Sequence, residues 1–192
     1  MITLNQEGTA YLKDGLEFSR VTDILKSCGI IDPRWFDEFA ALRGTYVHKA
    51  THLFDQGILN FKTLDPQLLG YVNAWASFRK DHPQLKFLAG EMTVYSERLR
   101  SAGTLDVLAE SPGCLEIIDK KAATTLNPAV EIQTAAYMTM YREMTAHKKV
   151  IKRRAVQLFP DGTYKSRILA DVNDVSIWLS AVNIHNWKRK RR

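Results

Sequence analysis

The spacing of hydrophobic positions changes twice along the chain. Up to about residue 85, apolar side chains recur every three or four residues, which predicts helices over 21–27, over 32–57 and from residue 65 onward. The pattern then shortens to apolar runs typical of an antiparallel meander of strands, over 87–95, 103–110 and 114–121. A helix over 128–144, a hairpin over 150–169 and a closing amphipathic helix complete the chain. This order predicts an α/β fold, with a central mixed sheet flanked by helices.

Turn and capping residues mark the ends of these elements. Asp14-Gly15 lies between two apolar runs and predicts a hairpin over 11–18, and Ser19 is the expected cap of the first helix. Asp32-Pro33 and Asp65-Pro66 each pair an N-cap with a proline at the first helical position. The expected buried faces of the two longer helices consist of Phe36, Phe39, Val47, Ala50 and Phe54, and of Leu69, Val72, Trp75 and Ala76.

The size and composition of the chain are those of an ordinary globular protein. Its 192 residues fit one domain over 1–192, with a mainly helical part over 1–85, a catalytic core over 86–145, and a C-terminal hairpin, helix and basic tail over 146–192. No apolar stretch is long enough to span a bilayer, and the first residues lack the order of a signal peptide, so we expect a cytosolic protein without membrane contacts. Cys28 and Cys114 cannot supply the ligands of a four-cysteine iron–sulfur cluster.

The formal net charge of +6 is unevenly distributed. Basic residues cluster at 148–149, at 152–154 and in the terminal run 188–192. Such clusters favour a polyanionic partner, although the terminal run alone could equally be a solvated surface.

The residues with the clearest chemical potential are Asp119-Lys120-Lys121, which follow an apolar strand. In an extended strand Asp119 and Lys121 project from one face, while Lys120 points away. If Glu110 pairs with Leu115 across a four-residue loop, Asp106 lies opposite Asp119, with β-carbons about 5 Å apart. A shift of one residue would move Asp106 to the opposite face.

Two carboxylates this close repel each other unless a cation lies between them, so the pattern indicates a site for a hard divalent ion. Such an ion acidifies water and neutralises charge on a phosphate, a neighbouring lysine can orient or deprotonate the water, and the Lys120 carbonyl could be a further ligand. A D-x-K triplet by itself is more often part of a solvated strand than of such a site.

The chain also contains three other motifs in a recognisable order. These are Gly44-Thr45-Tyr46-Val47-His48, Ala102-Gly103-Thr104-Leu105-Asp106, and Gln133 with Tyr137 as Q-x-x-x-Y. Together with Ile117-Ile118-Asp119-Lys120-Lys121 they resemble the RecB-like branch of the PD-(D/E)XK nucleases, including phage-type exonucleases. The resemblance covers roughly residues 43 to 141.

This resemblance implies a restriction-endonuclease-like core and a set of roles. Asp106, Asp119 and Lys121 would be catalytic, with contributions from Gln133, Tyr137 and the less regular acidic position Glu91. His48, Asp106, Asp119 and the Lys120 carbonyl would bind Mg²⁺, for which Mn²⁺ would substitute. Each residue also has a plainer interpretation: His48 could be a packed histidine, Gln133 and Tyr137 a helix-surface pair, and Glu91 a solvated strand residue. We further expect Arg43, Lys152, Arg153 and Arg154 to contact DNA.

The implied function is hydrolysis of DNA ends by a metal-dependent exonuclease, with 5′ to 3′ polarity, in recombination, repair or phage replication. The setting would be the cytoplasm of a bacterium or of a phage-infected host, where a single-strand annealing or recombination protein could be a partner and oligomers could form. Two alternatives remain open. One is a structure-specific endonuclease of the same superfamily, and the other is a DNA-binding module without catalysis.

Overall fold

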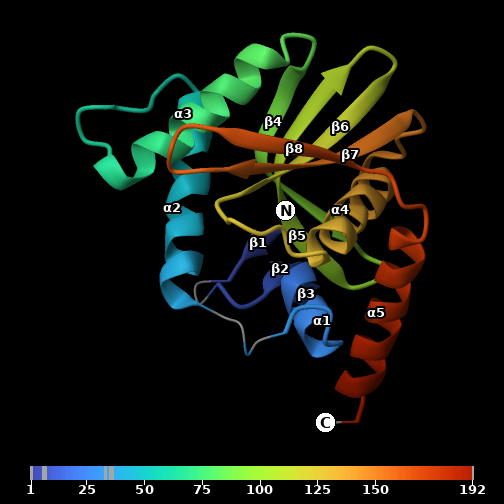
Figure 1. Cartoon of the computed structure of the whole chain (residues 1–192). Coiled ribbons are helices and arrows are strands. Elements are labelled where there is room, and N and C mark those ends of the chain that lie inside the picture. The colour runs from blue at the N-terminus through green and yellow to red at the C-terminus, as the bar shows by residue number, and fades with distance from the viewer. Residues whose placement is uncertain (1, 6–7, 33, 35–36, 192) are drawn as a thin grey trace.

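A mixed β-sheet with helices packed on both faces forms the centre of the protein (Figure 1). The structure is a computed structural model that describes residues 2–5, 8–32, 34 and 37–191. Its strands are β1 (Thr3–Leu4), β2 (Tyr11–Lys13), β3 (Leu16–Arg20), β4 (Lys86–Ser96), β5 (Ser101–Ser111), β6 (Cys114–Lys121), β7 (Val150–Leu158) and β8 (Tyr164–Leu169). Its α-helices are α1 (Val21–Ser27), α2 (Glu38–Asp55), α3 (Pro66–Asp81), α4 (Ala129–Thr145) and α5 (Asp174–Arg189).

The strands follow the order β1-β2-β3-β5-β6-β7-β8, and β4 pairs with β5 outside this path. The β3–β5 and β6–β7 pairs are parallel, whereas the other pairs are antiparallel. Helix α4 makes the crossover between the parallel strands β6 and β7, as such a connection requires. The predicted α/β fold with a central mixed sheet is therefore confirmed.

Strand β5 has an unusual environment because two strands share one of its edges. Strand β4 covers the other edge along nearly its whole length. On the shared edge, β3 pairs with Ser101 and Ala102, and β6 pairs with Val107 to Ser111. The four residues between them, 103–106, have no strand partner on that edge in the described part of the chain. We call this interval the β5 gap.

Two hydrophobic cores hold the layers together. One contains side chains of α1, α4 and α5 packed on one face of the sheet, and the other contains side chains of α2 and α3 packed on the opposite face. The neighbouring residues Ile117 and Ile118 of β6 point into different cores, as alternation along a strand requires. Strand β6 is thus buried from both sides, and α4, with ten buried residues, is fixed firmly against it.

Several details of the helices differ from the sequence-based expectations. Helix α1 is preceded by Arg20 rather than Ser19, and no side chain caps it. Helix α2 begins at Glu38 and is capped by Asp37, whose side chain accepts a hydrogen bond from the Ala40 N–H. The expected start at Asp32 is wrong, because the Asp32 carboxylate instead accepts from Arg34; Pro33 and Phe36 lie outside the described residues.

The expected buried faces are only partly correct. Phe39 is 83% exposed, because the first turns of α2 lie beyond the core and only Val47, Ala50 and Thr51 of this helix are buried. Leu69 is also exposed, while the cap Asp65 and the proline Pro66 of α3 are as predicted. The described part of the chain contains no helix of the length and apolar character that a bilayer span requires.

Candidate active site

The candidate catalytic residues come together at the β5 gap. Asp106 lies on β5, Asp119 and Lys121 on the end of β6, and Glu91 on β4. His48 comes from α2, while Gln133 and Tyr137 come from α4. Residues that are up to 89 positions apart in the chain thus meet where β3 and β6 separate.

Asp106 lies just beyond the last residue pair of the ladder between β5 and β6. The predicted register is confirmed, since Glu110 pairs with Leu115, but pairing stops at Val107 and Ile118, one residue before Asp106 and Asp119. The Asp106 Oδ2 atom then accepts a hydrogen bond of 2.6 Å from the Lys120 N–H. Its Oδ1 atom lies 3.3 Å from Nδ1 of His48. One carboxylate therefore connects β5, β6 and α2.

Glu91 lies beside Asp106 in an uncommon backbone conformation. The pairs Gly90–Val107 and Met92–Leu105 place it opposite Asp106. Its φ angle of 49° is in the left-handed region, which costs a non-glycine residue energy and is found often at functional sites. Ligand atoms of His48, Glu91 and Asp106 lie within 4.8 Å of one another, so these three side chains could hold a metal ion together.

Asp119 is fully buried, and its carboxylate faces Lys121 rather than the His48 group. Its Oδ2 atom lies 2.7 Å from Nζ of Lys121. Neither Asp119 oxygen has a partner with hydrogen-bond geometry, and the same is true of the buried Oε1 atom of Glu91. Buried carboxylate oxygens without hydrogen bonds are costly, and a bound cation removes that cost. The donor set of carboxylates, one imidazole and a strand carbonyl therefore fits a divalent ion.

Lys121 is linked to the Q-x-x-x-Y helix through a chain of polar contacts. Its Nζ donates to Gln133 Oε1 at 3.3 Å, and Gln133 Nε2 donates to the Tyr137 hydroxyl at 2.8 Å. The Tyr137 ring lies over Gly103, where a β-carbon would be only 2.6 Å from Cε1 of the ring. Glycine at this motif position is thus explained by the close approach of Tyr137.

The pKa values reflect this crowding. Burial raises the pKa of Asp119 to about 6; Lys121 opposes the shift and Asp106 adds to it. Burial also acts on Asp106, but the attraction of His48 outweighs it and holds the pKa of Asp106 well below its usual range. For His48, burial lowers the pKa, yet Asp106 raises it more, so the pKa lies above the ordinary value. The site concentrates negative charge that a cation would stabilise.

Lys120 is the site residue that sequence reasoning described least well. The prediction that its side chain points away from Asp119 agrees with its position, but the side chain is completely buried. Its Nζ donates to Thr51 Oγ1 at 2.9 Å and lies 5.2 Å from the ring centre of Trp75. The alternation of β6 residues between two cores was the signal that could have revealed this burial.

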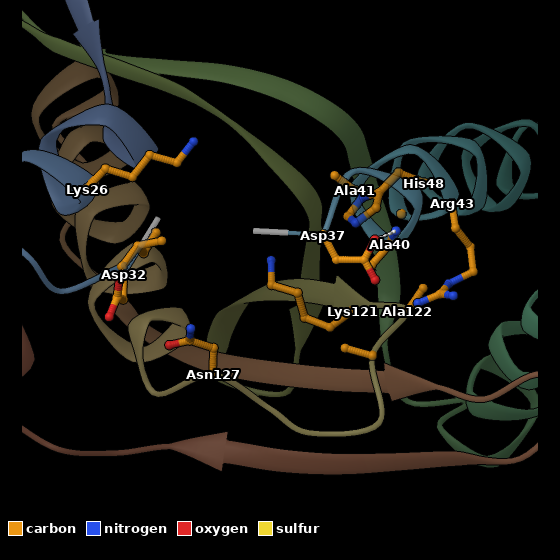
Figure 2. A pocket seen from close by; sticks show the side chains of 13 residues that line it. Lys26, Asp32, Asp37, Ala40, Ala41, Arg43, His48, Lys121, Ala122 and Asn127 are labelled. Atoms are coloured by element: carbon orange, nitrogen blue, oxygen red, sulfur yellow. Dashed lines mark hydrogen bonds between the residues drawn. The ribbon is translucent and has the colours of Figure 1, made fainter. Parts of the chain in front are cut away.

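A pocket of about 810 Å³ opens beside these residues (Figure 2). Lys121 reaches into it from the end of β6, and His48 lines it from α2. Lys26, Arg43 and Asn127 surround the space in front of Lys121. Of the residues expected to contact DNA, Arg43 is therefore next to the candidate site.

The other expected DNA contacts lie elsewhere. Arg153 is buried, with an ion pair of 2.8 Å to Asp174 and hydrogen bonds to two backbone carbonyls. Arg154 forms an ion pair of 2.9 Å with Glu116. Lys152 is exposed on β7, opposite Glu116 and distant in register from Asp119. Because internal partners occupy both guanidinium groups, we leave Arg153 and Arg154 out of the proposed DNA surface.

Another basic surface lies at the end of α5. Arg100, Asn186, Arg189 and Lys190 line a cavity of about 330 Å³ there. Arg189 also donates to Ser19 Oγ, and Lys188 donates to the Ser27 carbonyl, which fixes the end of the helix against β3 and α1. The terminal basic run is thus partly built into the fold through residue 191, and Arg192 lies outside the described residues.

Comparison with known proteins supports the fold. The chain is similar to the crystal structure of a "putative exonuclease" from Eubacterium rectale, with a TM-score of 0.58 and 18% identity over 90% of this chain and 79% of that chain. A second structure, of the protein SSO0001, has a TM-score of only 0.39 and 14% identity over 95% of this chain and 81% of that chain, and carries no argument. No family model matches the chain, and no curated protein matches it in sequence. The chain thus has a nuclease-like fold.

Proposed function

We propose that the protein is a Mg²⁺-dependent deoxyribonuclease of the PD-(D/E)XK superfamily, in its RecB-like, phage-type exonuclease branch. The observation that carries the proposal is the meeting of three carboxylates, an imidazole and Lys121 at the β5 gap. The shared fold with a protein described as a "putative exonuclease" agrees with it. Substrate and polarity follow from the resemblance of the motifs, and we propose degradation of DNA ends in the 5′ to 3′ direction.

The residues that would hold the ion are His48, Asp106, Asp119 and the Lys120 carbonyl, with Glu91 as a further carboxylate. The buried oxygens of Asp119 and Glu91 that lack hydrogen-bond partners support this assignment. When bound, a divalent ion acidifies water and neutralises charge that develops on the phosphate. In the hydrolysis, a water oxygen attacks phosphorus and one P–O bond to the sugar breaks, which leaves a phosphate and a hydroxyl.

In this proposal the Lys121 ammonium stabilises the negative charge that develops during hydrolysis. The Lys121 side chain is 29% exposed and lines the pocket, so its ammonium can meet both the phosphate and the attacking water. Asp119 and Gln133 hold it from two sides, and Tyr137 in turn fixes the amide of Gln133. An ammonium that is oriented before the substrate arrives stabilises developing negative charge without further reorganisation.

The pocket in front of Lys121 favours action on a strand end. Its volume of about 810 Å³ is within the range of sites that enclose small ligands, so it is large enough for part of a DNA strand. Lys26 and Arg43 provide positive charge for phosphates at its sides. A terminal nucleotide could therefore occupy the pocket while the next phosphate faces the carboxylates.

The decisive experiment compares linear DNA, labelled at either end, with covalently closed circular DNA. We expect Mg²⁺ and Mn²⁺ to support degradation of the linear substrate from the 5′ end, and the closed circle to stay intact. Excess chelator should stop the reaction, and Ca²⁺ should bind without comparable turnover because it activates water less. Cleavage of the circle would instead identify an endonuclease. Binding without any cleavage of linear, nicked or flapped DNA would identify a non-catalytic module.

A further inference from the structure

The buried side chain of Lys120 connects the metal-binding strand to the helix that carries His48. The main chain of this residue belongs to the site, since its N–H donates to Asp106 and its carbonyl is a proposed ligand. Its ammonium crosses to the other face of the sheet and reaches Thr51 on α2. Thr51 lies one turn beyond His48, so a single residue contacts both parts of the proposed metal site.

Near His48, helix α2 has few other anchors, because its directional contact through Asp55 with Trp75 and Arg79 of α3 lies about two turns farther along the helix. Of its 18 residues, only Val47, Ala50 and Thr51 are buried, and none of them is large. Small buried side chains contribute little hydrophobic stabilisation and allow a helix to slide or rotate on the surface beneath it. The hydrogen bond from Lys120 is directional and is enclosed by Trp75, so it can fix the position of the helix where the small contacts cannot.

We propose that Lys120 is a positioning residue: its buried ammonium, held by Thr51 and the face of Trp75, fixes α2 so that His48 reaches Asp106. The expected effect on catalysis rests on the proposed function, whereas the anchoring of α2 by Lys120 is independent of that function. The usual effect of such an outer contact on a metal site is to hold a ligand in the required orientation.

The chemical environment makes a purely stabilising role a poor explanation. The Lys120 ammonium lies beside Trp75, a residue of the α2–α3 core. It attracts the carboxylates of Glu91 and Asp106, but no described carboxylate forms an ion pair with it within 4 Å. An apolar side chain of the same length would fill this position without the cost of burying a charge. The charge is costly to bury here, and the directional contact with α2 is a benefit that an apolar side chain could not provide.

Lys120→Met removes the charge and the donor but keeps the length of the side chain. We expect the variant to stay folded, with a urea midpoint equal to or above that of the wild type, while its affinity for Mn²⁺ falls about ten- to hundredfold. In DNA hydrolysis kcat should fall while KM for DNA changes little, because the pocket is untouched. A folded Lys120→Met protein with wild-type Mn²⁺ affinity and kcat would overturn the proposal.

Substitutions at Thr51 test the same contact from α2 and remain informative if Lys120→Met fails to fold. Thr51→Val removes the acceptor and should reproduce the loss of Mn²⁺ affinity, whereas Thr51→Ser keeps the oxygen and should restore most of it. Thr134→Val is the matched control. Thr134 is as buried as Thr51, and both hydroxyls donate to the backbone carbonyls three and four residues earlier. Among the described residues, however, no lysine donates a hydrogen bond to Thr134. Equal effects of Thr51→Val and Thr134→Val on Mn²⁺ affinity would overturn the proposal.

Amide hydrogen exchange in metal-free protein separates this inference from the proposed function. Lys120→Met should accelerate exchange in α2 beyond His48 roughly tenfold relative to α4, whether or not the protein cleaves DNA. Unchanged exchange in α2 would show that the ammonium does not anchor the helix. If the wild type neither binds Mn²⁺ nor cleaves DNA, but Lys120→Met still accelerates exchange in α2, the nuclease proposal would be overturned and the anchoring role would remain supported.

Discussion

Asp119→Asn should make the metal-free protein more stable while it removes the metal site. Burial raises the pKa of this carboxyl from 3.8 to about 6 in spite of the attraction of Lys121. At pH 8 the folded protein therefore holds a carboxylate that is about 3 kcal/mol less stable, relative to its protonated form, than the same group in the unfolded chain. Asparagine has nearly the same shape and no charge, so the variant should avoid most of this cost.

The effect has a defined pH dependence. Because the folded pKa is raised, the folded protein holds this proton more tightly than the unfolded chain does, and wild-type stability falls as pH rises through the interval from 3.8 to about 6. The advantage of Asp119→Asn should thus be about 1 kcal/mol at pH 4.5 and should reach its full size above pH 7. Lys121 keeps its contact with Gln133 and its partial exposure to water in the variant.

Urea unfolding in excess chelator, at pH 4.5 and at pH 8, measures this difference directly. Addition of Mn²⁺ should then reverse the order. A ligand at a thousand times its Kd stabilises the folded state by about 4.1 kcal/mol, which exceeds the advantage of about 3 kcal/mol that the variant has in chelator, and the wild type alone should gain it.

Asp174→Asn is a useful control, because Asp174 is also buried but its ion-pair partner Arg153 is buried with it, whereas Lys121, the partner of Asp119, is partly exposed. Loss of one partner of a buried pair costs about 3–5 kcal/mol, so this variant should be destabilised. If Asp119→Asn were destabilised in chelator at pH 8 as well, the attraction of Lys121 would outweigh burial, and the argument for an ion between these carboxylates would lose its basis.

Three further outcomes are expected. Lys121→Ala should retain Mn²⁺ binding but slow DNA hydrolysis by a factor on the order of a hundred or more. The control Lys80→Ala, on the exposed side of α3, should hydrolyse DNA at the wild-type rate. A folded Lys121→Ala protein with the wild-type rate would contradict the assigned role. Gly103→Ala should displace the Tyr137 ring and reduce kcat by about a hundredfold. The urea midpoint of the variant would separate this effect from unfolding. An unchanged kcat would show that the position of the ring is unimportant. Neutralising Arg100 and Lys190 together should reduce the slope of log K for DNA against log salt by about 2, and an unchanged slope would remove the α5 cavity from the DNA surface.

The sequence predicted the parts of the site that local rules control. The Pro112-Gly113 turn determines the register of β5 and β6, and alternation along β6 places Asp119 and Lys121 on one face. The spacing of Gln133 and Tyr137 by one helical turn likewise follows from helix geometry alone. The residues are therefore found together as predicted, although the assignment of their roles stays a proposal, as do the division of the chain into parts and its cellular location.

The remaining features depend on partners that are distant in sequence. We expected the basic run at 152–154 to contact DNA, but β7 lies between β6 and β8, so its alternate side chains must point into the protein. Arg153 finds Asp174 there, a residue of α5 that no local pattern connects with it. The left-handed conformation of Glu91, which lies opposite Asp106 in the β4–β5 ladder, likewise has no local pattern that marks it in the sequence.

The β5 gap has a consequence for the kinetics of refolding. One of its borders is the β5–β6 hairpin, whose two-residue turn makes it a local structure that forms quickly. The other border is the parallel pairing of β3 with Ser101 and Ala102, which joins segments more than eighty residues apart and requires closure of a long loop. A chain diluted out of urea should therefore recover its helical circular dichroism before the proposed DNA hydrolysis, and the delay between the two signals would report the docking of β3.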